Sequence, residues 1–67
     1  MARYIITAVA KIGDYKLACF YDKKGMFVTV TDLTNLHLFV TKEAAQKSID
    51  LLRKDIAENC AILEVCV

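Results

Sequence analysis

The sequence predicts a two-layer α+β fold in which one helix packs on one face of an antiparallel sheet. Two runs rich in β-branched and aromatic residues, 2–12 and 15–21, are separated by one short turn. A capped amphipathic stretch follows at 42–57, and a further apolar run, 61–67, comes after it. Because 67 residues suffice for one small domain, we expect a single domain over 1–67.

Tight turns are expected to join the first three strands. The runs 2–12 and 15–21 flank a glycine and an aspartate, and the run 26–31 (MFVTVT) is dense in β-branched residues. The tetrapeptide at 22–25 (DKKG) suits a type I turn followed by a glycine in the left-handed conformation, which gives a bulged hairpin. Such short connections predict an antiparallel meander.

A fourth strand and a helix are expected next. Residues 36–40 (LHLFV) predict this strand or, as the alternative, an extended lead-in to the helix. Thr41 suits a helix N-cap because its hydroxyl can accept a hydrogen bond from a free amide of the first turn, where the helix dipole also favours Glu43. These signals predict a helix from about Lys42 to Ala57. Its apolar stripe would consist of Ala45, Ile49, Leu52 and Ile56.

The resulting element order is ββββαβ. The helix would run back across one face of the sheet, and the final strand would then pair antiparallel with the first. Numbering the predicted strands along the chain, the expected spatial order is 5-1-2-3-4. In this arrangement the second face of the sheet has no helix to cover it.

The chain has more apolar residues than a domain of this size can bury. They make up 57% of the sequence without glycine, whereas average globular usage is about 45–50% even with glycine. A domain of about 60 residues buries only about 60% of the surface that its unfolded chain exposes. We therefore expect apolar side chains at the surface.

This excess is concentrated in strand 2–12, because apolar residues occupy both of its faces. In a sheet covered on one face only, apolar and polar residues should alternate along each strand. The leading hypothesis is a small, non-enzymatic protein-interaction module that self-associates, most simply as a two-fold homodimer, through the uncovered sheet face. The alternative is a sheet that curls around the helix and covers its own second face. The predicted interface consists of Ile5, Val9, Ala18, Phe20 and Phe27.

Nucleic-acid binding is the second hypothesis. Residues 1–31 carry five basic side chains against two acidic ones, so this half is mildly basic. The residues that would bind phosphates are Lys11, Lys16, Lys23 and Lys24. The net charge of the whole chain is only +1, which argues against this class of partner.

The sequence indicates no enzyme, metal site or cofactor. It contains one histidine, His37, and its cysteines at 19, 60 and 66 have no zinc-ligand spacing. The two isolated glycines form no phosphate-binding loop. Catalysis would require a pocket that holds His37 together with two acidic side chains.

Compartment and origin follow from the same features. The apolar run 4–10 is too short to span a bilayer and lacks a convincing signal-peptide cleavage site. With an odd number of cysteines, the chain is expected to be cytoplasmic with reduced thiols, and to have no membrane partner. Its size suits an accessory or regulatory protein of bacterial or phage origin.

Overall fold

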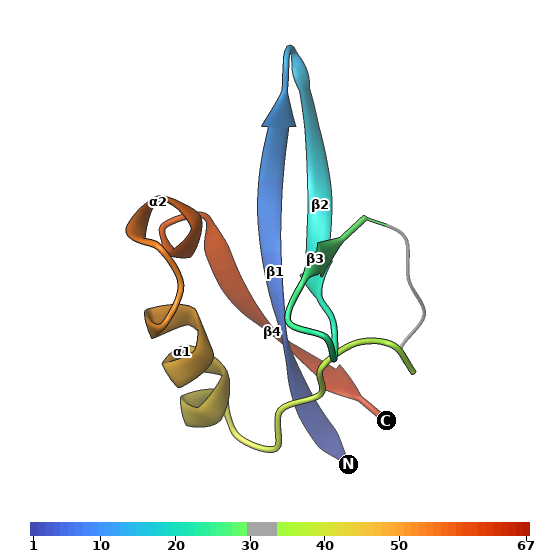
Figure 1. Ribbon diagram of the computed structural model, residues 1–67. Coiled ribbons are helices and arrows are strands. Elements are labelled where there is room, and N and C mark those ends of the chain that lie inside the picture. Colours follow the sequence, from blue (N-terminus) through green and yellow to red (C-terminus); the bar gives the residue numbers. More distant parts are fainter. Residues whose placement is uncertain (30–33) are drawn as a thin grey trace.

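The computed structural model describes residues 1–29 and 34–67, and it forms a four-stranded antiparallel sheet with two short helices (Figure 1). The strands are β1 (Ala2–Ile12), β2 (Tyr15–Tyr21), β3 (Phe27–Val28) and β4 (Cys60–Cys66), and the helices are α1 (Lys42–Asp50) and α2 (Lys54–Ala57). This arrangement confirms the predicted α+β class.

Strand β1 is central to the sheet, whose order is β3-β2-β1-β4. Its residues 2–8 pair antiparallel with β4, and its residues 7–12 pair antiparallel with β2. The final strand therefore lies beside the first. The predicted five-stranded order is nevertheless wrong, because the described residues form four strands and not five.

The missing strand is the segment 36–40, which makes only isolated bridges, from Leu36 to Asp22 and from Phe39 to Tyr4. Beyond Thr7 towards the N-terminus, β1 is no longer paired with β2, so its main-chain groups on that side are free to pair with another segment. Phe39 occupies that edge: the Tyr4 amide donates to the Phe39 carbonyl at 2.9 Å and the Phe39 amide donates to the Tyr4 carbonyl at 2.8 Å. The segment therefore pairs with β1 instead of extending the sheet beyond β3.

Strand β3 is shorter than expected. The predicted strand 26–31 is represented by Phe27–Val28, and its positions 30 and 31 lie outside the described residues. The turn before it matches the prediction, because Gly25 has a φ of 81°. One carboxylate oxygen of Asp22 accepts from the amides of Lys24 and Met26, both at 2.9 Å, and this fixes the turn.

The helix begins as predicted but does not continue as predicted. The Thr41 hydroxyl accepts from the Ala44 amide at 3.1 Å, which confirms the N-cap. The helix stops at Asp50, and α2 begins only at Lys54. A straight helix over 42–57 would be about 24 Å long.

The anchors on either side of the helical segment explain this break. Phe39 pairs with Tyr4 and Cys60 pairs with Ala8. These anchor points on β1 are four residues apart, or about 13 Å. The chain turns at 51–53 because a straight helix would extend past the second anchor. Separately, no helix in the described residues is long and apolar enough to cross a membrane.

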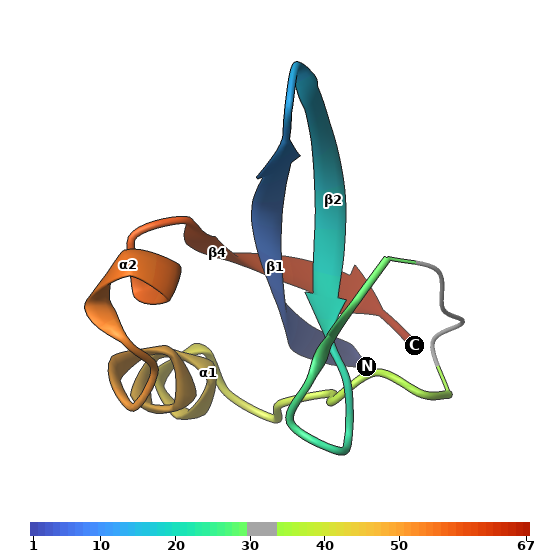
Figure 2. The ribbon, with the colours of Figure 1, turned by 45° about the horizontal axis from the view of Figure 1, so that its top comes forward.

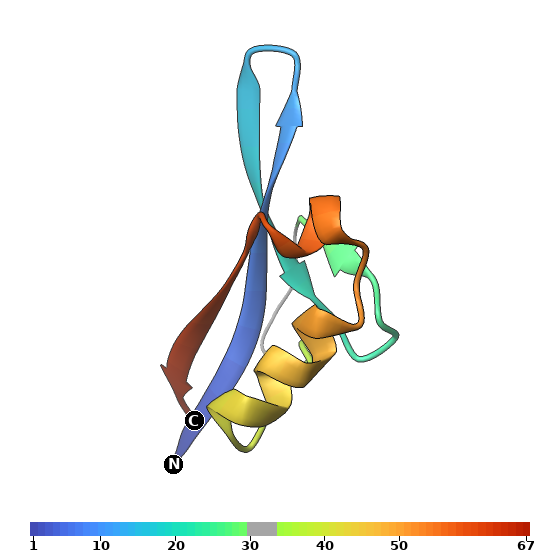
Figure 3. The same ribbon diagram turned by 90° about the vertical axis from the view of Figure 1, so that its left-hand side faces the viewer.

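The core lies between one face of the sheet and the helices, as Figure 3 shows from the side. Ile6 and Ala45 are fully buried, and Phe39 and Ile49 complete the cluster. Even-numbered residues of β1 point to this face because side chains alternate along a strand. The helical layer therefore covers the N-terminal part of β1, where Ile6 lies.

We expect Thr41→Ala to lower the free energy of unfolding by about 1 kcal/mol, because the Ala44 amide loses its hydrogen-bond acceptor. Urea unfolding followed by circular dichroism measures this change. Thr41→Ser keeps the hydroxyl and is the matched control. Equal stability of the alanine and serine variants would contradict the capping role.

Candidate interaction surface

The distal half of the β1–β2 hairpin extends beyond the rest of the sheet. The last pair between β4 and β1 is Cys60 with Ala8, and the last pair between β3 and β2 is Val28 with Phe20. Past these pairs, and among the described strands, the two long strands pair only with each other, over residues 9–18, which we call the arm. Figures 1 and 2 show the arm projecting past both helices, and the longest dimension of the molecule is 38 Å.

The end of the arm is a two-residue turn. Ile12 pairs with Tyr15, which leaves Gly13 and Asp14 as the loop. Gly13 has a φ of 59°, and a glycine at the first loop position is typical of a type II′ turn. This turn matches the twist of the strands, so the local sequence favours the hairpin register of the arm.

One face of the arm is apolar and exposed. Ile12 pairs with Tyr15, and Ala10 pairs with Leu17, on the same side of the sheet as the helices. Tyr15 is 77% exposed, Ile12 is 60% exposed and Leu17 is 40% exposed. The sequence pattern places these side chains with the core-facing set, and the structure shows that the helical layer ends before it reaches them.

The opposite face of the arm carries part of the predicted interface. Val9 pairs with Ala18, both are exposed, and half-buried Phe20 lies on this same face two residues along β2. Lys11 and Lys16 occupy the next pair towards the tip. The structure therefore brings Val9, Ala18 and Phe20 together on the face that the helices do not cover.

The other two predicted interface residues are not on this surface. Ile5 is only 3% exposed and is therefore buried within the chain. Phe27 packs against the core cluster on the helix side, because it pairs with Tyr21, whereas Phe20 pairs with Val28. Placing Phe27 on the same face as Phe20 is wrong, because the register of β3 gives it the opposite orientation.

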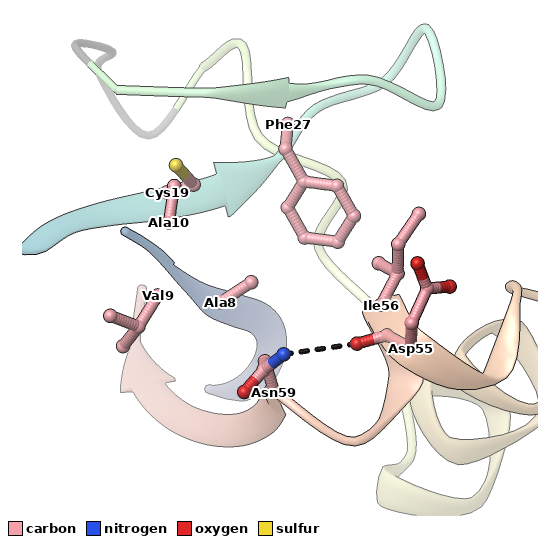
Figure 4. A pocket seen from close by; sticks show the side chains of 8 residues that line it. All are labelled: Ala8, Val9, Ala10, Cys19, Phe27, Asp55, Ile56 and Asn59. Carbon is pink, nitrogen blue, oxygen red and sulfur yellow. Dashed lines mark hydrogen bonds between the residues drawn. The ribbon is translucent and has the colours of Figure 1, made fainter. Parts of the chain in front are cut away.

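A shallow apolar groove lies at the base of the arm, between β1, β2, β3 and α2 (Figure 4). Its volume is about 260 Å³, and its apolar wall includes Ala10, Cys19, Phe27 and Ile56. The Asn59 side-chain amide donates to the Asp55 carbonyl at 2.9 Å on its polar side. Since Ala10 also belongs to the arm, the groove continues into the apolar face of the arm.

The four candidate phosphate-binding lysines form two separate pairs. Lys11 and Lys16 lie directly opposite each other on the arm. Lys23 and Lys24 lie in the turn before β3, seven residues or roughly 20 Å from Lys16 along the strand direction. Within the described part of the chain the only ion pair is Arg53 with Asp55, so neither arm lysine has an acidic partner.

His37 lies in an aromatic cluster and not beside acids. Its ring stacks on Phe39 with centroids 3.9 Å apart and an interplanar angle of 8°. It also lines an open hollow of about 370 Å³ with Lys23 and Leu38. Among the described residues, those that line this hollow include no carboxylate.

The remaining titratable groups have simple structural surroundings. The charge of Glu64, which also accepts a hydrogen bond from the Tyr4 hydroxyl at 3.3 Å, raises the pKa of that phenol. Burial raises the pKa of the Cys60 thiol, which suppresses its reactive thiolate. Over residues 1–29 and 34–67, no three His, Cys, Asp or Glu side chains are grouped to hold a metal ion.

Comparison of this chain with protein-family models, with characterised proteins and with solved structures finds no match. Among its own residues, the arm groups four exposed large apolar side chains on one projecting element: Val9, Ile12, Tyr15 and Leu17.

We expect Lys16→Glu to raise the free energy of unfolding by roughly 0.5 kcal/mol, because it replaces a like-charge cross-strand pair with an attractive one opposite Lys11. Chemical unfolding at low salt measures the change, and added salt should reduce it. Lys16→Gln removes the repulsion alone and should fall between the two. A less stable glutamate variant would contradict direct opposition of the lysines.

Proposed function

We propose that this protein is a non-enzymatic interaction module that self-associates through its arm. One observation carries the proposal: the arm exposes large apolar side chains on a two-stranded hairpin with no third layer. An isolated two-stranded hairpin is at best marginally stable in water. A second surface that covers the arm would stabilise it and remove its apolar side chains from water.

The exposed area is of the right order for an interface. From their exposed fractions, Ile12, Tyr15 and Leu17 present roughly 400 Å² to solvent on one face of the arm. A standard interface buries about 800 Å² on each partner. The groove at the base of the arm adds apolar surface on the same face, beside Ala10 and its partner Leu17.

A second copy of the chain is the partner that we propose. Two-fold homodimers are the commonest assemblies, and a projecting arm presents the same apolar surface from each copy. We further propose that the protein acts in a reducing cytoplasm as an accessory protein of bacterial or phage origin. The odd number of cysteines in the sequence supports the proposed compartment.

Sedimentation at tens of micromolar tests self-association. The wild-type chain should sediment as a dimer, and Leu17→Lys should weaken association by about tenfold or more, the equivalent of roughly 1.4 kcal/mol. Leu51→Lys is the matched control, because Leu51 is 89% exposed but lies at the end of α1, away from the arm. A monomeric wild-type chain, or equal loss of association in both variants, would contradict the proposal.

Nucleic-acid binding is the second candidate, and the unpaired lysines of the arm favour it. The major groove of a DNA duplex admits a two-stranded β-ribbon, and Lys11 and Lys16 would face the phosphates. Only this pair lies on a projecting element, so Lys23 and Lys24 would contribute little to the same contact.

Fluorescence anisotropy with single-stranded and double-stranded probes tests this candidate. Binding through the arm would fall steeply with salt and would be lost in Lys11→Ala/Lys16→Ala. Lys23→Ala/Lys24→Ala would keep most of the affinity and serves as the charge-matched control. No binding to either probe at low ionic strength would remove the candidate.

A further inference from the structure

We propose that two copies join edge to edge through β2, as antiparallel strands related by a two-fold axis at Leu17. This inference rests on the proposed self-association and specifies its geometry. The interface would be a continuous sheet formed by the two arms, with strand order β1-β2-β2-β1. Two edge strands would thereby become interior strands.

The first support is the direction of the main-chain groups along β2. The Asp22 amide donates to the Met26 carbonyl at 2.9 Å, so Asp22 points its main chain away from β1. Main-chain groups alternate in direction along a paired strand, which means that Lys16 and Ala18 point to the same outer edge. Strand β3 pairs only as far as Phe20, so no described strand accepts or donates hydrogen bonds at Lys16 and Ala18.

The second support is the length and symmetry of this open edge. No described strand pairs with residues 15–19 on this side of β2, between the turn at the tip and the start of β3 pairing. An antiparallel two-fold pairing centred on Leu17 uses all five positions. Lys16 would exchange two hydrogen bonds with the partner's Ala18, and Ala18 would do the same with the partner's Lys16.

The third support comes from the side chains that this register places together. Leu17 would lie opposite the partner's Leu17, and Tyr15 would lie opposite the partner's Cys19. Leu17 and Tyr15 of each arm would thereby lose part of their exposed area to the partner arm. Each Lys16 would face a small alanine and not the other lysine, so the register avoids like-charge repulsion.

The other edge of the arm is less suited to the same role. Alternation also leaves the main-chain groups of Val9 and Lys11 without a strand partner, since β4 stops at Ala8. However, Asp55 and Asn59 border this edge where they line the groove, as Figure 4 shows. A two-fold pairing there would centre on Ala10, whose side chain buries much less area than that of Leu17.

Disulfide trapping tests the geometry. A residue on the axis lies opposite its own copy at a non-hydrogen-bonded position, where Cβ atoms are close enough for a disulfide. In a Cys66→Ser background, which removes the exposed native thiol, Leu17→Cys should form a covalent dimer under mild oxidation. Peptide mass spectrometry should map the bond to position 17 in both chains. Lys16→Cys and Ala10→Cys, each alone, are the matched controls and should cross-link at least tenfold more slowly.

The outcomes separate this inference from the proposed function. Sedimentation and circular dichroism of each variant before oxidation establish that it is folded and associated. A dimeric wild-type chain whose Leu17→Cys variant fails to cross-link, or cross-links no faster than Ala10→Cys, overturns the β2 edge and leaves self-association standing. A wild-type chain that sediments only as a monomer overturns both.

Discussion

The reciprocal main-chain pair between Tyr4 and Phe39 is the contact on which the rest of the structure depends. It fills the edge of β1 that β2 leaves open, and it ties the segment 36–40 to the centre of the sheet. Phe39 thereby enters the core beside Ile6, and Thr41 is positioned to begin α1 over the same face. Without this pair, the helical layer would have no fixed position above the sheet.

The arm follows from a mismatch between the two layers. Eleven residues of β1 extend for about 36 Å, whereas the helical layer is confined between anchors about 13 Å apart on that strand. The helices therefore cover only the N-terminal part of the hairpin. Part of the apolar excess of the sequence lies in this uncovered part, where Val9 is exposed on one face and Ile12, Tyr15 and Leu17 on the other.

Local signals predict much of this fold. The strands 2–12 and 15–21, the left-handed Gly25 and the Thr41 cap each depend on residues adjacent in sequence, and each is present. The break after Asp50 and the bridging of 36–40 depend on distant anchors, which periodicity does not report. The predicted strand 2–12 is longer than the predicted helix 42–57, and this difference in length indicates that the helix leaves part of the strand uncovered. No sequence pattern indicated which face Phe27 would take, because that depends on the register of β3.

The two-residue turn at Gly13 lets the arm form from residues that are close in sequence, and this affects which part of the protein unfolds locally. Its pairs join residues close in sequence, whereas the core joins Ile6 to Ala45 and Ile49. The arm can therefore fray and re-form while the body remains folded, as a unit of low local stability. In the proposed dimer, amide hydrogen exchange in the arm would follow protein concentration, whereas exchange around Ile6 would follow global unfolding. Substitutions in the arm would then change the proposed assembly while leaving the folded body largely unaltered.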